Sequence, residues 1–140
     1  MYISRTLFRR LNDTVALLRW GYGALIFFSG FDKIVDITNT QWIKLVSPEI
    51  EQSLPFKFAH IVLALSVLQM TIGVMLLIPR LARWGAYLGA LLLLFLAGDL
   101  WLTGIYYNRA VLNGIFAVSL FVLGHLIAVK EGIREASQHD

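Results

Sequence analysis

Four long apolar segments dominate this sequence and constrain its fold more than any other feature. They cover residues 14–35, 58–78, 82–103 and 111–129. A helix needs about 20 mostly apolar residues to cross a bilayer, and each segment reaches about that length. Because backbone polar groups must be hydrogen-bonded inside a membrane, we expect each segment to be helical. The sequence therefore predicts an all-α integral membrane protein, a four-helix bundle in one domain over residues 1–140.

Composition supports a membrane protein over a soluble one. Hydrophobic residues make up 58% of the chain and charged residues 15%, whereas a soluble domain carries about 25% charged residues. The absence of cysteine excludes disulfides, thiolate metal sites and cysteine nucleophiles. The net charge of +3 is carried by basic residues at the ends of apolar segments. This placement favours membrane lipid as the partner and argues against nucleic acid.

The connections between the segments predict how neighbouring helices run. The links at 79–81 and 104–109 hold little more than a turn, so the helices that they join should be antiparallel. The link at 36–57 is longer and contains apolar residues, including Trp42. We expect it to form a short amphipathic segment on the outer membrane surface, with Trp42 in a lid over one end of the bundle.

Basic residues flanking the segments predict the orientation. Lys and Arg in short loops concentrate on the cytoplasmic side. One side of the predicted bundle holds Arg5, Arg9, Arg10, Arg80, Arg83, Lys130 and Arg134, and the other holds Lys44, Lys57 and Arg109. The sequence thus predicts a multi-pass protein of the inner (plasma) membrane with both termini in the cytoplasm.

Small residues recur at helical spacing in every segment, as expected for membrane helices that pack closely. The glycines expected at helix contacts are Gly23, Gly30, Gly73, Gly85, Gly89, Gly114 and Gly124. On the first segment this face also carries Arg19 and Lys33, and on the third it continues to Asp99. The simpler interpretation of these faces is good helix packing with no further role.

Polar residues inside the apolar segments are the candidates for a ligand site. They are Lys33, Asp99, Gln69, His60, Arg19 and Asn113. Ionisable groups within a membrane are costly and normally face the bundle interior or a cavity. Arg19 and Lys33 lie near segment ends, where a long side chain can also extend to water. Asp99 has a short side chain, so it needs a cation, a water-filled cavity or protonation.

We therefore predict that Lys33 and Asp99 form one polar site in the outer half of the bundle. Such a pair either holds a ligand or only joins two helices, and a structural pairing of Asp99 with Lys33 or with Arg109 is the simpler interpretation. Gln69 is either an interhelical hydrogen-bonding group or a ligand contact. His60 lies about half a turn round the same helix from Gln69, because residues follow at about 100° each, and we expect it to be solvated.

Sequence motifs identify no catalytic residue, no metal site and no covalently bound cofactor. The chain contains no H-E-x-x-H, Walker or G-x-G-x-x-G motif. His60 and His125 lie near opposite membrane faces in the predicted bundle, which argues against haem ligation by the two together. The catalytic residues are thus unknown, and the chain is not expected to be catalytic on its own.

Several sequence features resemble the DoxX-like family of small membrane proteins. They are Leu18-Arg19, Gly23, residues 30–34, Trp42, Ser47-Pro48, and Gln69 and Gly73 followed by residues 76–80. The resemblance implies a four-helix membrane bundle. One branch of the family is related to the membrane subunit of thiosulfate:quinone oxidoreductase. This chain has Gln69 and Asn108-Arg109 where the family often has an acid, which weakens the case for proton or electron transfer.

Three functions remain open at this point. The first is an accessory membrane subunit of a redox complex, with quinone as the expected cofactor. The second is a non-catalytic scaffold that stabilises a larger membrane assembly, through other membrane subunits or further copies of itself. The third is a small-solute or lipid-binding membrane protein.

Overall fold

A computed structural model describes residues 4–35, 58–104 and 107–139, and these residues form four helices and no strand. The helices are α1 (Arg5–Val35), α4 (Phe58–Leu77), α5 (Ala82–Thr103) and α6 (Tyr107–Gln138). The expected all-α class is confirmed. The expected surface segment and its Trp42 fall in 36–57, outside the described residues.

Three of the helices are long and apolar enough to cross a membrane: α1, α5 and α6. α4 has 20 residues, and its apolar stretch, Leu63–Leu77, is shorter than the other three. These lengths support an integral membrane protein.

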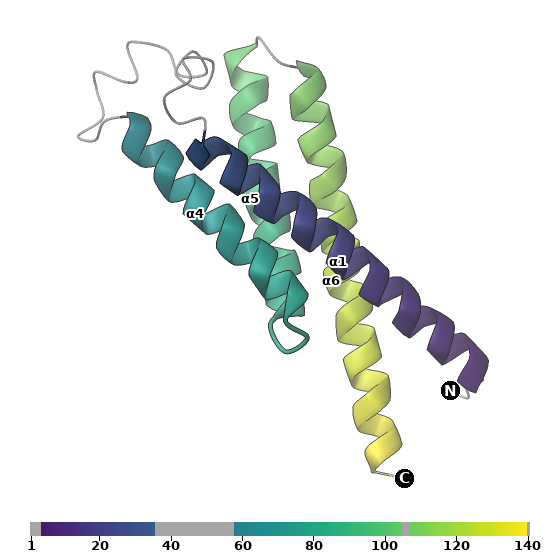
Figure 1. Cartoon of the computed structure of the whole chain (residues 1–140). Coiled ribbons are helices and arrows are strands. Elements are labelled where there is room, and N and C mark those ends of the chain that lie inside the picture. Colours follow the sequence, from purple (N-terminus) through teal and green to yellow (C-terminus); the bar gives the residue numbers. More distant parts are fainter. Residues whose placement is uncertain (1–3, 36–57, 105–106, 140) are drawn as a thin grey trace.

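α1 and α6 extend well beyond their apolar segments. α1 begins at Arg5, although the apolar segment begins at 14, and α6 continues past 129 to Gln138. The added residues are mostly good helix formers such as Arg, Leu, Glu and Ala, so the helices continue into polar sequence. Figure 1 shows both polar ends projecting beyond the turn between α4 and α5.

α4 and α5 each stop at a residue that cannot readily continue a helix. α4 ends just before Pro79, which has no N–H to continue a helix, and the Leu81 N–H donates to the Ile78 carbonyl oxygen at 3.1 Å. α5 ends at Thr103, and the next residue, Gly104, has a left-handed φ of 71° that suits glycine. We call the end with the α4–α5 turn the Pro79 end, and the end with the α5–α6 junction the Gly104 end.

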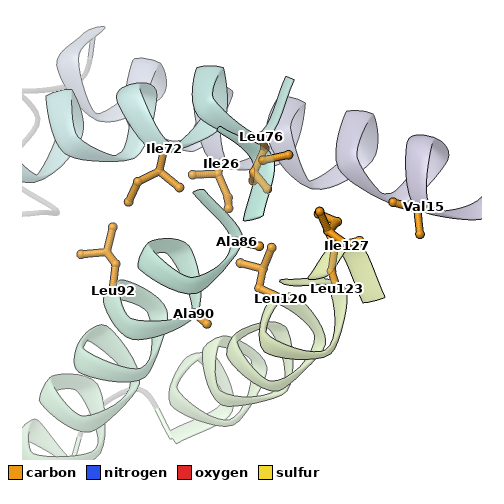
Figure 2. Close-up of a cluster of buried hydrophobic side chains, with 11 residues drawn as sticks. Val15, Ile26, Ile72, Leu76, Ala86, Ala90, Leu92, Leu120, Leu123 and Ile127 are labelled. Carbon is orange, nitrogen blue, oxygen red and sulfur yellow. The ribbon is translucent and has the colours of Figure 1, made fainter. Parts of the chain in front are cut away.

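The helices pack mainly in two pairs, α1 with α4 and α5 with α6. α4 contacts α5 less extensively, and α1 contacts α6 least of these pairs. Figure 1 shows α4 and α5 separating from their turn toward the Gly104 end. A buried apolar cluster joins all four helices, with Ile26 from α1, Ile72 and Leu76 from α4, Ala86 from α5 and Leu120 from α6 (Figure 2).

Candidate functional site

Arg19 of α1 binds the end of α4. Its side chain is buried, with Nε donating to the Leu76 carbonyl oxygen at 3.0 Å and Nη2 to that of Leu77 at 3.3 Å. The last carbonyls of a helix have no partner within the helix, and a cation there also interacts favourably with the helix dipole. Of the two orientations left open by the sequence, Arg19 therefore adopts the inward one, where it caps α4.

Lys33 and Gln69 join α1 to α4 nearer the Gly104 end. The Lys33 ammonium donates to Gln69 Oε1 at 2.6 Å and to Ser29 Oγ, one turn earlier on α1, at 3.3 Å. Gln69 is only 3% exposed. A charged donor makes this hydrogen bond stronger than a neutral one. Gln69 is thus an interhelical hydrogen-bonding group.

The expected pair of Lys33 and Asp99 is not formed. Asp99 is exposed on α5, and no ion pair between it and Lys33 occurs among the described residues. The prediction that Asp99 points inward was therefore wrong. α5 and α4 diverge toward the Gly104 end (Figure 1). The side of α5 that carries Gly85, Gly89 and Asp99 is therefore buried at the two glycines and exposed at Asp99.

Glycines allow α1 and α4 to pack backbone against backbone. A Cβ added at Gly73 would lie 2.8 Å from the carbonyl oxygen of Gly23. One added at Gly30 would lie 2.6 Å from that of Ser66. Real Cβ atoms do not approach backbone so closely, so Gly23, Gly30 and Gly73 set the distance between these two helices.

Gly85, Gly89 and Gly124 lie at the other close contacts. A Cβ at Gly85 would lie 2.9 Å from Met75 Cβ on α4, and one at Gly124 would lie 2.9 Å from the Tyr87 ring. At Gly89 the nearest atoms, from α4 and α6, are each 3.2 Å away.

Gly114 departs from this pattern. A Cβ there would meet no atom of the described residues within 4 Å, so its expected packing role is corrected. The buried side of α6 runs through Ala117, Leu120 and Leu123. Leucines and alanines rather than the small-residue spacing decide which side of α6 packs, and Gly114 is left beside that face.

The remaining candidates do not join a common site. His60 is exposed on α4, and Asn113 is half-buried on α6. Residues 4–35, 58–104 and 107–139 contain no group of three or more His, Asp or Glu side chains suited to hold a metal ion. Of the candidates, Arg19 and the Lys33–Gln69 pair thus form separate contacts between helices.

The structure adds an ion pair and a groove that sequence reasoning missed. Arg83 Nη1 of α5 lies 3.1 Å from Glu131 Oε2 of α6, and both side chains are partly exposed. No local spacing signals this pair, because 48 residues separate its members. A surface groove of about 590 Å³ follows the uncovered side of α1, lined by Gly21, Ala24, Leu25, Phe28, Ser29, Phe31 and Asp32.

Comparison with known proteins gives no relative: no family model, no curated protein and no solved structure matches the chain. The function must therefore be argued from the arrangement of these residues, and the resemblance to DoxX-like proteins stays a hypothesis.

Proposed function

We propose that this protein is an accessory subunit of a larger assembly in the plasma membrane. The helices α1, α4, α5 and α6 cross the membrane as an antiparallel bundle, and both termini lie in the cytoplasm. The lengths of α1, α5 and α6 support the crossing. The short turns support the antiparallel arrangement. Basic residues gathered at the Pro79 end, such as Arg80 and Arg83, support the cytoplasmic position of that end.

The polar interior supports a structural role for this chain. The buried polar side chains in the described residues are Arg19, Ser66 and Gln69, and no buried side-chain nitrogen or oxygen there lacks a hydrogen-bond partner. Arg19 and Gln69 are engaged by neighbouring helices rather than directed into a cavity. Such groups fix helix positions, which is what a supporting subunit requires.

The proposal of a larger assembly rests on two residues on the uncovered side of α5, Gly98 and Asp99. A Cβ at Gly98 would meet nothing within 4 Å, and Asp99 is exposed without a hydrogen bond or ion pair to any described residue. In contact with lipid, glycine weakens a helix by about 0.5–1 kcal/mol relative to alanine, and a carboxylate is costly. Both residues become favourable when a helix of another protein packs against this side of α5. The glycine permits close approach, and the carboxylate accepts a hydrogen bond from a basic or amide side chain of that helix.

A comparison of two glycine variants tests this contact. The full-length tagged protein is extracted from its own membranes in mild detergent, and its complexes are sized on native gels. Gly98→Leu should shift the protein from a large complex to its own size, because leucine blocks close approach. Gly132→Leu is the matched control, since Gly132 is also open but lies on the polar extension of α6. Equal shifts in both variants, or a wild type without a complex, would overturn the proposal.

Quinone binding is a second candidate, favoured by the groove along α1. The groove is walled by Leu25, Phe28 and Phe31, and it reaches Ser29, whose hydroxyl oxygen accepts from Lys33. Apolar walls suit a prenyl tail, and the Ser29 hydroxyl keeps its proton for donation to a quinone carbonyl. The resemblance to a quinone-linked membrane subunit points the same way. The quinone would supply the redox chemistry, and this chain would bind and orient it.

Filling the groove tests the second candidate. Quinone bound per protein is measured by extraction and mass spectrometry after purification. Leu25→Trp should lower the bound quinone, because indole occupies the groove. Leu91→Trp, on the uncovered side of α5, is the control and should retain it. Purified wild type without quinone, or equal loss in both variants, would exclude the groove as the site.

A further inference from the structure

Lys130 of α6 lies near two other cationic side chains, Arg19 of α1 and Arg134 of α6. Val15 of α1 and Ile127 of α6 belong to the same buried cluster (Figure 2). α1 and α6 are in contact, and the charge of Arg19 on α1 acts on Lys130 of α6. Arg134 follows Lys130 by four residues, so these two lie on one face of α6. We call Arg19, Lys130 and Arg134 the crossing cluster.

The positive charge of the crossing cluster is not balanced within the described residues. Burial lowers the pKa of Lys130, the charges of Arg19 and Arg134 lower it further, and only Glu131 opposes them. The Glu131 carboxylate is itself bound to Arg83. The side chains of Lys130 and Arg134 have no hydrogen bond or ion pair with any described residue. Among the described residues, no carboxylate is therefore paired with Lys130 or Arg134, and the nearby Glu131 is already engaged by Arg83.

The position of the crossing cluster defines the kind of anion that fits. Lys130 directly follows the apolar segment 111–129, at the depth expected for lipid headgroups. Val122 and Val129, on α6 before it, are exposed. An anion that carries an apolar chain can place its charge at Lys130 and Arg134 and its chain against these valines. A small water-soluble anion gains only the first contact.

The side chains also have complementary donors. Arg19 is held by the carbonyls of Leu76 and Leu77, so it contributes a fixed positive charge. Lys130 offers three N–H donors, and Arg134 offers the planar fork that binds two phosphate oxygens at once. We propose that Lys130 and Arg134, on one face of α6 and near Arg19 of α1, bind the phosphate group of an anionic phospholipid. A zwitterionic lipid is disfavoured, because its own cation adds positive charge to the crossing cluster.

Lipid retention by the purified full-length protein tests this site, independently of any assembly with other subunits. The protein in detergent is mixed with phosphatidylglycerol, phosphatidylcholine or glycerol 3-phosphate, and bound molecules are counted by native mass spectrometry alongside thermal unfolding. Phosphatidylglycerol should bind about tenfold more tightly than phosphatidylcholine and should raise the unfolding temperature. Glycerol 3-phosphate carries the same phosphate without chains, and it should raise that temperature much less. Equal stabilisation by glycerol 3-phosphate would overturn the lipid assignment in favour of a free phosphate.

Charge-matched variants locate the site. Lys130→Gln with Arg134→Gln should weaken phosphatidylglycerol binding about tenfold. Without lipid this double variant should unfold no earlier than wild type, because the mutual repulsion is removed. Arg9→Gln with Arg10→Gln removes the same charge from exposed positions on α1 and should bind normally. Equal weakening in both double variants would show general attraction to the basic end of the protein and would overturn the site. Arg134→Gln alone, at an exposed position, keeps the test usable if the double variant is unstable.

Discussion

Arg19 on α1 donates from Nε to the backbone carbonyl oxygen of Leu76 on α4 at 3.0 Å, across 57 residues of sequence. This contact satisfies the end of a helix that is followed almost at once by Pro79. Because proline has no N–H, a carbonyl near the end of α4 loses a possible partner from the following chain. Arg19 supplies the replacement, which explains an arginine buried between two apolar helices.

Replacing Arg19 should destabilise the protein through these carbonyls. Arg19→Met keeps an unbranched apolar side chain but leaves the Leu76 and Leu77 carbonyls unsatisfied. A buried group without its hydrogen bond costs about 1–3 kcal/mol, so the unfolding temperature in detergent should fall clearly. Thermal unfolding of the purified protein measures the change.

Two controls separate capping from charge. Arg19→Lys should recover part of the loss, since an ammonium still donates to a carbonyl. Arg9→Met removes an exposed cation from the same helix and should change the free energy of unfolding by no more than about 0.5 kcal/mol. If Arg9→Met were as damaging as Arg19→Met, the capping role would be wrong.

Lys33 and Gln69 should be energetically coupled, whereas Lys33 and Asp99 should not. In a double-mutant cycle, Lys33→Met and Gln69→Leu should show a coupling of about 0.5–1.5 kcal/mol, because the 2.6 Å hydrogen bond is lost in each single variant. A cycle of Lys33→Met with Asp99→Asn should be additive within about 0.5 kcal/mol. Both cycles are measured by unfolding in detergent, and the reverse ranking would contradict the observed partner of Lys33.

Glycine substitutions should separate close contacts from open positions. Gly73→Ala places a methyl group against the backbone of Gly23 and should cost about 1–3 kcal/mol of stability. Gly114→Ala meets no neighbour and should be neutral or stabilise by up to about 1 kcal/mol through helix propensity. Detergent unfolding distinguishes the two, and an equal loss at Gly114 would restore its role as a packing residue.

The proposed orientation predicts which side of the membrane each end of α6 faces. The chain contains no cysteine, so single cysteines can be introduced without background labelling. Asn108→Cys should react with a membrane-impermeant maleimide in intact cells, and Ser137→Cys only after permeabilisation. Both positions are exposed. Labelling of Ser137→Cys, without labelling of Asn108→Cys, in intact cells would show that the proposed orientation is wrong.

Periodicity along single helices predicted most of the buried faces. The spacing of Arg19, Gly23, Ile26 and Gly30 corresponds to the buried side of α1. Ser66, Gln69 and Gly73 are likewise buried on α4. Within a helix, spacing fixes the relative directions of side chains, and small residues mark the side that another backbone can approach. The buried sides of α1 and α4 can therefore be predicted from the sequence.

Asp99 and Gly114 are two positions at which residue spacing predicted the wrong environment. Asp99 follows the spacing of Gly85 and Gly89, yet it is exposed. Spacing assumes that a neighbouring helix follows the whole face, whereas α4 and α5 separate beyond their turn (Figure 1). The prediction that Gly114 lies at a helix contact was wrong because α6 packs through Leu120 and Leu123. The pairing of helices and their divergence depend on all the interfaces at once.

The sequence by itself determined that this is a helical membrane protein, because apolar segments of membrane-spanning length must satisfy their backbone hydrogen bonds internally. Only the tertiary structure decided which polar groups meet. Lys33 binds Gln69 rather than Asp99, and Arg19 caps α4. The physical reason is that hydrogen bonds require approach within about 3 Å. Whether two groups come this close depends on the distance between whole helices, on their rotation and on their crossing angle. The spacing of residues along one helix gives no information about these quantities.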